Sequence, residues 1–422
     1  MVLQDDWPTM ADGTSYDGKQ LLHLVRTGNS PFEGVWDVEL LIREIEENLN
    51  TEVTDILTAQ KGSNNYGFNL ATSDGSNIVA RLARGDVNMP DFDGFAIEKQ
   101  VPEAQFEAAV YTLLASNHGI RASTLLYYRV PVQNPPPRDT IPEDLTGRRL
   151  FVFKRAEGVN NVWTSLTADN KLALLDQLAC MRAALFHYEL PLDFASQYLL
   201  DRMFDFKPET LSMPVASTRE FWMHVLESKI NATIKNEGDM IGWKVDEETV
   251  GPIALAAKMS LLRALPHILP QETTDVPLYR LVLEHGDFGI HNTSITTDTD
   301  GTPIVTSLYD WETGCIVPAL LSDPLVAVSP VDLFIDANGG PAVTRIPKDP
   351  TPLDLETYAD WSRHYFKKLY SEAPDYKSAI RAGKDVRYLW FALRDWHGGD
   401  SEEFFGNLGT WAEQRIKESE AA

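Results

Sequence analysis

Cysteine, positive charge and long hydrophobic runs are all scarce in this sequence of 422 residues. Only Cys180 and Cys315 occur, so we do not expect a disulfide framework. No apolar run reaches the roughly 18 residues that cross a bilayer. The acidic start, MVLQDDWPTM, lacks the basic and apolar regions of a signal peptide. These absences predict a cytoplasmic protein with no membrane partner.

Positive charge is scarce because 37 lysines and arginines stand against 62 aspartates and glutamates. The formal net charge of −25 argues against nucleic acid or an anionic membrane surface as a partner, since both bind positive patches. It is compatible with a small cationic substrate, although acidic surfaces often serve only solubility. The length predicts two lobes or domains, and neither a Walker P-loop nor a G-x-S-x-G motif is present.

The residues that indicate chemistry are concentrated in residues 281–314, LVLEHGDFGIHNTSITTDTDGTPIVTSLYDWETG. LVLE predicts a short strand and HGDFGIHN a loop. Two strand-like runs follow, and Asp300-Gly301 between them is a strong hairpin-turn signal. Because positions 292 and 310 are equidistant from residue 301, we expect the hairpin to bring Asn292 and Asp310 together.

An amide oxygen and a carboxylate are hard ligands of the kind that Mg²⁺ prefers, together with the phosphates of a nucleotide. Asn292 and Asp310 are therefore candidate metal ligands. A second carboxylate, Asp287, lies five residues before Asn292 and is then free to accept a hydrogen bond from a substrate hydroxyl.

The motifs HGDFGIHN and LYDWETG, with His285, Asp287, Asn292 and Asp310, resemble those of the aminoglycoside phosphotransferase and choline kinase branch of the protein-kinase-like superfamily, and its fungal members in particular. The resemblance implies an ATP-dependent phosphotransferase that acts on a hydroxyl of a small molecule. It implies ATP and Mg²⁺ as cofactors and Asp287 as the catalytic residue.

The fold implied by the resemblance is α+β, with two protein-kinase-like lobes. A small N-terminal lobe would contain an antiparallel β-sheet and one helix, and a larger C-terminal lobe would be mainly helical. We expect an N-terminal arm and leading helix at 1–50, a nucleotide-binding lobe at 51–157, and a lobe with the catalytic loop, metal site and acceptor pocket at 158–422. Residues 1–35 show little periodicity, so the arm is expected to be loosely ordered.

Three strand-like runs, VTDILTAQ, YGFNLAT and SNIVARLA, begin the expected small lobe. Gly62, Ser63 and Asn64 lie in the polar loop between the first two, where backbone amides would cover nucleotide phosphates. By the family pattern, Arg81 in VARL occupies the position of the phosphate-binding lysine. Arginine also binds phosphate, but its planar fork differs from an ammonium group, so this departure bears on turnover.

The helical run PEAQFEAAVYTLLASN would supply the carboxylate that holds this cation in the family. We assign that role to Glu107, with Glu103 as the competing candidate. The apolar strand RRLFVFK would end in the segment that contacts adenine through the backbone, here from Lys154 to Ala156. Asp323 resembles an aspartate that steadies the catalytic loop in relatives, although a turn-forming Asp-Pro explains it equally well.

Two other interpretations remain open. The substitution of arginine at position 81 is compatible with a catalytically silent kinase-like protein that binds a nucleotide or metabolite. Alternatively, His285 and Asp287 with His364 or His397 could form the facial triad of a non-haem iron oxygenase. The long helical patterns after the motif disfavour that third interpretation, because such enzymes surround the triad with short strands.

Overall fold

The computed structural model describes residues 7–10, 12–33, 36–84, 97–131, 145–203, 206–235, 249–272, 276–336, 338–396 and 400–421. Its contacts divide the chain into two compact units. The first comprises Met1–Val159, Thr293–Thr296 and Thr306–Glu312, and the second comprises Asn160–Asn292, Thr297–Val305 and Thr313–Ala422. An antiparallel sheet lies in the first unit and most helices in the second, so the expected α+β class is confirmed.

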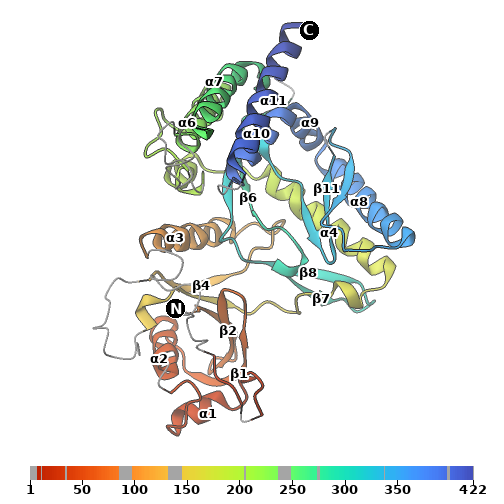
Figure 1. The fold of residues 1–422 in the computed structure, drawn as a ribbon. Coiled ribbons are helices and arrows are strands. Elements are labelled where there is room, and N and C mark those ends of the chain that lie inside the picture. The colour runs from red at the N-terminus through yellow and green to blue at the C-terminus, as the bar shows by residue number, and fades with distance from the viewer. Residues whose placement is uncertain are drawn as a thin grey trace. The chain divides into compact units, whose positions relative to one another are not determined.

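The sheet of the first unit has five antiparallel strands in the order β1-β2-β3-β5-β4 (Figure 1). Their bounds are Val53–Lys61, Asn65–Thr72, Asn77–Ala83, Leu125–Arg129 for β4 and Leu150–Lys154 for β5. Side chains of β2 alternate between buried and partly exposed, as the period-2 pattern predicted. Gly75 has φ +81° in the turn before β3, a conformation that glycine adopts without strain.

The first unit also contains three helices, α1 (Leu21–Arg26), α2 (Val38–Leu49) and α3 (Ile97–Leu114). The Asp37 side chain caps α2 by accepting a hydrogen bond from the backbone of Glu39. Glu44 of α2 accepts hydrogen bonds from Tyr127 and Arg129 of β4, at 2.9 and 2.6 Å. These contacts attach α2 to the edge of the sheet, and α3 is the helix expected from PEAQFEAAVYTLLASN.

The expectation of a loosely ordered arm is wrong for the described part of residues 7–36. Trp7, Tyr16, Phe32 and Trp36 are all buried in one core with the sheet. Trp7 lies 5.2 Å from Phe32, and Trp36 lies 5.9 Å from Phe68 of β2, measured between ring centroids. Hydrophobic periodicity missed this segment because the aromatic residues that anchor it are spaced irregularly along the chain.

The second unit is mainly helical. Thr167 caps the long helix α4 by accepting a hydrogen bond from the backbone of Asn170, as the sequence predicted. Helix α11 packs against α7, and α4 packs against α8 (Figure 1). The helices are α4 (Ala168–His187), α5 (Leu192–Tyr198), α6 (Arg219–Thr233), α7 (Val250–Ile268), α8 (Pro352–Glu372), α9 (Pro374–Ala382), α10 (Lys384–Arg394) and α11 (Ser401–Ala421). None of the helices described is long and apolar enough to cross a bilayer.

Short strands lie directly before and after the loop at 285–292, which contains the H-G-D motif. Strand β6 (Leu281–Glu284) pairs with β9 (Cys315–Pro318). The predicted hairpin is present as β7 (Thr293–Thr297) and β8 (Pro303–Leu308), with Gly301 at φ +86° in its turn. A three-stranded antiparallel sheet was not expected, and it consists of β10 (Val326–Val328), β11 (Val331–Ile335) and β12 (Pro341–Thr344).

Candidate active site

The first group of site residues surrounds Arg81, which projects from β3 in the first unit. Its side chain is 15% exposed. Nη1 donates to Oε1 of Glu107 at 3.3 Å, and Nη2 donates to Oδ1 of Asp310 at 2.9 Å. The structure therefore pairs Arg81 with Glu107 of α3, the carboxylate that we preferred to Glu103.

Tyr111, which the sequence reasoning missed, completes this group. Its hydroxyl accepts a hydrogen bond from the backbone N–H of Asp310 at 2.9 Å and donates to Oε1 of Glu107 at 3.2 Å. Arg81, Glu107, Tyr111 and Asp310 thus form a closed ring of hydrogen bonds. The available signal was the spacing of Tyr111 four residues after Glu107, which places both on one helix face.

Backbone contacts at the end of β8 fix the position of Asp310. Leu308, at the end of β8, exchanges backbone hydrogen bonds with residues 121 and 123 of the first unit. Asp310 follows with φ +70°, a left-handed conformation that is uncommon for a residue with a side chain. Such local strain persists where surrounding contacts enforce it, and it is often found at functional sites.

Burial and charge act in opposite directions on the ionisable groups of the ring. Burial alone lowers the pKa of the Arg81 guanidinium, but the carboxylates of Asp310 and Glu107 more than offset this, so the pKa is raised above its ordinary value. Burial raises the pKa of Glu107, and Arg81 and Arg149 offset only part of the increase. Oε2 of Glu107 is buried without a hydrogen-bond partner among the described residues, so the ring retains one unused acceptor.

Glu312, the last residue of the D-W-E motif, connects the ring to the β1–β2 turn. Arg149 donates to its Oε2 at 2.9 Å, and Asn64 donates through its side-chain amide to its Oε1 at 3.2 Å. Asn64 was expected to contribute a backbone amide to phosphate, whereas its observed contact is through the side chain. The structure nevertheless brings this turn residue together with the D-W-E motif in the first unit.

The rest of the β1–β2 turn is held by its own backbone and by Arg84. Arg84 Nη1 donates to the carbonyl oxygens of Gly62 and Ser63 at 2.9 and 3.0 Å. The N–H of Gly62 donates to the carbonyl of Asn65 at 2.9 Å. Of the amides expected to cover phosphate, that of Gly62 is therefore already used within the hairpin.

The segment after β5, which we expect to contact adenine, is also partly used by the sheet. The N–H of Lys154 donates to the carbonyl of Thr124 at 2.9 Å, and that of Arg155 donates to Asn77 at 2.9 Å. The N–H groups of Lys154 and Arg155 are therefore already used, and they are not available for the adenine contact that we expect in this segment.

The second group of site residues belongs to the loop after β6, in the second unit. Gly286, between His285 and Asp287, has φ +82°. A Cβ atom built there would lie 2.1 Å from the carbonyl oxygen of Thr313. Both the backbone conformation of Gly286 and the nearby backbone of Thr313 therefore require glycine at this position, which explains the H-G-D form of the motif.

Asp287 and Asn292 contact each other within this loop. Nδ2 of Asn292 donates to the Asp287 backbone carbonyl at 2.9 Å and to its Oδ2 at 3.1 Å. His291, which the sequence reasoning did not assign, places Nε2 2.9 Å from the same Oδ2. The hydrogen bond from His291 lowers the pKa of Asp287 despite partial burial, so this carboxylate is ionised at neutral pH.

The geometry of Asn292 leaves its amide oxygen available. Both side-chain hydrogen bonds of Asn292 within the described residues are donated by Nδ2, which orients the amide group. The residue lies in a short 3₁₀ helix, Ile290–Asn292, and is 4% exposed. An oriented amide oxygen and the half-exposed carboxylate of Asp287 fit the chemistry of a metal and hydroxyl site.

A buried ion pair between Arg182 and Glu284 holds the start of the loop at 285–292. Arg182 of α4 donates to Oε2 of Glu284 at 2.6 Å, and Ser322 donates to Oε1 of the same carboxylate. The Arg182 guanidinium also lies 4.3 Å from the ring centre of Phe288. Glu284 and Phe288 flank the H-G-D motif, so Arg182 is a positioning residue that sequence reasoning missed.

Asp323 does not take the supporting role considered for it. Its Oδ1 accepts a hydrogen bond from the backbone of Leu325 at 3.1 Å, which is the turn-forming contact typical of an aspartate before proline. Within the described residues, the loop is held instead by Arg182 and Glu284.

The iron interpretation gains no support from the part of the chain that the structure describes. That part contains no cluster of three histidine, cysteine or acidic side chains suited to a metal ion. His364 places Nε2 2.8 Å from Oδ1 of Asp176, and His397 lies outside the described residues. Magnesium needs fewer protein ligands, because it retains waters and binds substrate phosphates.

No protein-family model matches the sequence, and no curated protein matches it. Similar solved structures include the ADP-bound aminoglycoside phosphotransferase APH(2'')-Ib, with 11% identity, a TM-score of 0.41, and coverage of 90% of this chain and 97% of that one. A microcompartment-associated aminopropanol kinase has 14% identity, a TM-score of 0.38 and coverage of 90% and 98%. The macrolide 2'-phosphotransferase MphH from Brachybacterium faecium has 13% identity, a TM-score of 0.36 and coverage of 88% and 98%.

Proposed function

We propose that this protein is an ATP-dependent phosphotransferase that transfers the γ-phosphate to a hydroxyl of a small molecule. The observation that carries the proposal is the ring in which a buried strand cation, Arg81, bonds both to a helix carboxylate, Glu107, and to the D-W-E aspartate, Asp310. These residues are 26 and 229 positions from Arg81 in the sequence. Their convergence is expected of a kinase site.

In this reaction the substrate hydroxyl oxygen forms a bond to the γ-phosphorus, the bond from that phosphorus to the β–γ bridging oxygen breaks, and ADP leaves. Asp287 accepts the hydrogen bond of the hydroxyl and finally its proton. Because its pKa is lowered, Asp287 is a weak base, and its main contribution is to orient the nucleophile. His291 and Asn292 hold the carboxylate in place for that role.

ATP and Mg²⁺ fit the residues that are present. Arg81 would bind the phosphates, the turn containing Ser63 and Asn64 would cover them, and the backbone at Ala156 would contact adenine. The amide oxygen of Asn292 and the carboxylate of Asp310 would hold Mg²⁺, which neutralises phosphate charge when bound.

The second candidate is a catalytically silent protein that binds a nucleotide or metabolite. The 2.9 Å hydrogen bond from Arg81 to Asp310 favours it, because Arg81 then competes with a metal for the carboxylate. In the active protein, phosphate must replace part of this ion pair. Turnover with Mg-ATP by the unaltered protein distinguishes the two candidates, since a silent protein phosphorylates no compound.

The direct test is a mass-shift screen of hydroxylated metabolites incubated with Mg-ATP, with Asp287→Ala beside the unaltered protein. We expect phosphorylation of at least one compound and a loss of roughly a thousandfold or more in the variant, from combined positioning and general-base losses. Asp300→Ala, in the exposed hairpin turn, is the matched control and should retain activity.

Two outcomes would contradict the proposal. Near-normal turnover of Asp287→Ala would exclude Asp287 from its assigned role. If no compound is phosphorylated but Mg-ATP raises the melting temperature, the silent binding protein is favoured, and if ATP also fails to stabilise the protein, both candidates are lost.

A further inference from the structure

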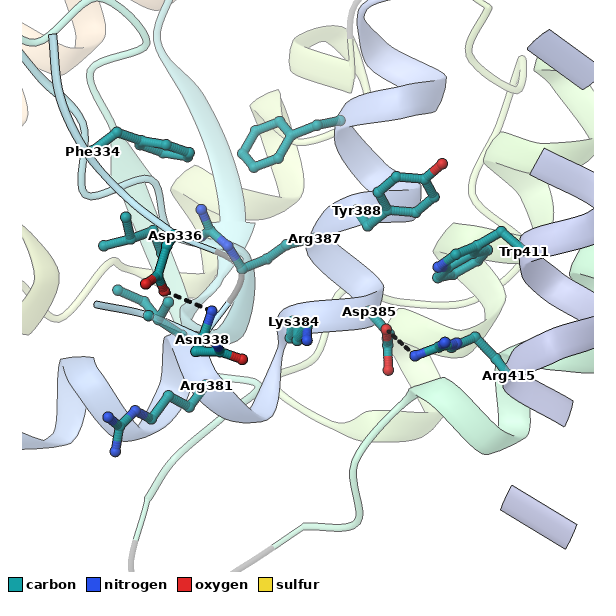
Figure 2. Close-up of a pocket in the computed structure, with 14 residues that line it drawn as sticks. Phe334, Asp336, Asn338, Arg381, Lys384, Asp385, Arg387, Tyr388, Trp411 and Arg415 are labelled. Atoms are coloured by element: carbon teal, nitrogen blue, oxygen red, sulfur yellow. Dashed lines mark hydrogen bonds and ion pairs between the residues drawn. The ribbon is translucent and has the colours of Figure 1, made fainter. Parts of the chain in front are cut away.

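A cavity with a volume of about 670 Å³ lies in the second unit (Figure 2). It is formed by the end of β11 with the turn after it, and by α9, α10 and α11. Neither Asp287 nor Asn292 lines it. A volume of this size is in the range of small-molecule sites.

Positive charge dominates the lining, although the chain as a whole is strongly acidic. Lys384 and Arg381 line the cavity without a salt bridge among the described residues, although both act by charge on Asp336 in the same lining. Nε of Arg415 is buried without a hydrogen-bond partner within the same residues. The cavity therefore offers several donors that an anionic group could satisfy.

The two carboxylates of the lining are already engaged. Asp336 accepts backbone hydrogen bonds from Asn338 and Gly340 at 2.7 and 2.9 Å, which hold the turn after β11 and keep the pKa of Asp336 lowered. Asp385 lies 3.5 Å from Arg415, the pair drawn in Figure 2. The lining therefore has an excess of positive charge, because four basic side chains stand against these two carboxylates: Arg381, Lys384, Arg387 and Arg415.

Aromatic rings form the apolar part of the same wall. Tyr388 of α10 and Trp411 of α11 lie 4.7 Å apart between ring centroids and stand side by side at the cavity in Figure 2. Tyr388 is 47% exposed, so part of its ring is accessible from the cavity. The buried Arg387 is held by the Ser322 carbonyl and lies 5.3 Å from the ring centre of Phe391.

We propose that this cavity binds a small anionic aromatic compound, one that joins a ring to a carboxylate or phosphate. Lys384 with Arg381 would hold the anionic group, and the ring would pack on Tyr388 and Trp411. Phe391 also lines a second cavity of about 150 Å³ that includes Gly286 and Phe288, on either side of Asp287. The binding site thus shares one wall with the neighbourhood of the catalytic loop but does not depend on phosphotransfer.

The test measures binding by isothermal titration calorimetry in the absence of ATP. The probes are 2-naphthoate, phenyl phosphate, inorganic phosphate and the neutral isostere 2-naphthamide. We expect at least one of the two aromatic anions to bind roughly tenfold or more tightly than both 2-naphthamide and inorganic phosphate, because only the aromatic anions satisfy both parts of the site. Preference for 2-naphthoate or for phenyl phosphate identifies the anionic group.

The affinities of variants show whether the aromatic anions bind in this cavity. Lys384→Glu should weaken the aromatic anions at least tenfold, Lys384→Gln less, and Trp411→Ala should weaken them through loss of the ring contact. Lys367→Glu, the same change at an exposed lysine of α8, is the control and should alter affinity less than twofold. Circular dichroism establishes that each variant is folded.

The proposal is overturned if no aromatic anion binds, if 2-naphthamide binds as tightly as 2-naphthoate and phenyl phosphate, or if Lys384→Glu and Lys367→Glu reduce affinity equally. Since no outcome involves turnover, failure of the kinase proposal leaves this result unaffected.

Discussion

Replacing Glu107 with glutamine removes one charge from the ring around Arg81 and leaves its shape unchanged. The amide oxygen of glutamine can still accept hydrogen bonds from Arg81 and Tyr111. At an effective dielectric constant of about 20, unit charges 3.3 Å apart attract by about 5 kcal/mol. Removing the charge also relieves the cost of burying it, and Asp310 still pairs with Arg81. We therefore expect a net loss of about 3 kcal/mol, the lower end for a broken buried ion pair.

The assay is urea denaturation, with hydrogen exchange measured by mass spectrometry to assign the loss to β3 and α3. Glu47→Gln, at an exposed position of α2 in the same unit, is the matched control and should change stability by less than about 0.5 kcal/mol. Equal stability of Glu107→Gln and Glu47→Gln would refute the reasoning, because it would show that Arg81 draws no net stabilisation from Glu107.

A double variant tests whether the two carboxylates act on the same cation. Glu107→Gln with Asp310→Asn leaves Arg81 buried without any carboxylate of the ring. Each single variant retains one partner, so the double variant should lose at least about 1 kcal/mol more than the sum of the singles. Additive losses would indicate that Asp310 and Glu107 stabilise the protein independently.

Three further predictions concern the second unit and use the same denaturation assay. Gly286→Ala should destabilise the protein by about 2 kcal/mol or more, since Gly286 has φ +82° and the new Cβ would meet Thr313. Gly406→Ala within α11 should be neutral or stabilising by up to about 1 kcal/mol, because a Cβ atom there meets no neighbour. Destabilisation by both variants would contradict this. Arg182→Met should cost about 3 to 5 kcal/mol of stability, because it leaves Glu284 buried without its cation. Arg263→Met breaks an exposed ion pair with Glu413 and should cost less than about 1 kcal/mol. Comparable losses would mean that burial does not decide the effect. Asp354 completes a capping box with Thr351, whose hydrogen bonds lower the pKa of Asp354. The contribution of the Asp354 carboxylate to stability should therefore be present above the ordinary aspartate pKa, near 4, and disappear as pH falls through the lower pKa of the folded state. A stability difference from Asp354→Asn that does not change between pH 6 and pH 2 would refute this.

Local patterns predicted most of the elements correctly. Strands β1 to β3 follow from strand-like runs and from turn residues such as Asp74-Gly75, and α4 follows from its cap at Thr167. The hairpin around Gly301 was predicted for the same reason. Such features depend on residues near one another in the sequence, so a single sequence contains the information needed.

Features that depend on distant contacts were missed or wrong. The described part of residues 7–36 is ordered because its aromatic rings pack on the sheet, and nothing in its periodicity indicates that partner. Tyr111, His291 and Arg182 could not be assigned roles either, since each acts through a side chain whose position depends on the tertiary structure. The three-stranded sheet at 326–344 was likewise not predicted.

The sequence alone determined the H-G-D and D-W-E motifs, since residue type and spacing are local properties, and the resemblance that these motifs carry implied the α+β class and the choice of Glu107. Only the tertiary structure decided what Asp310 contacts. Asp310 forms an ion pair with Arg81, 229 residues away. A buried cation must be neutralised by whichever carboxylates the fold brings within reach, and that selection is made by packing, which spacing along the chain does not encode.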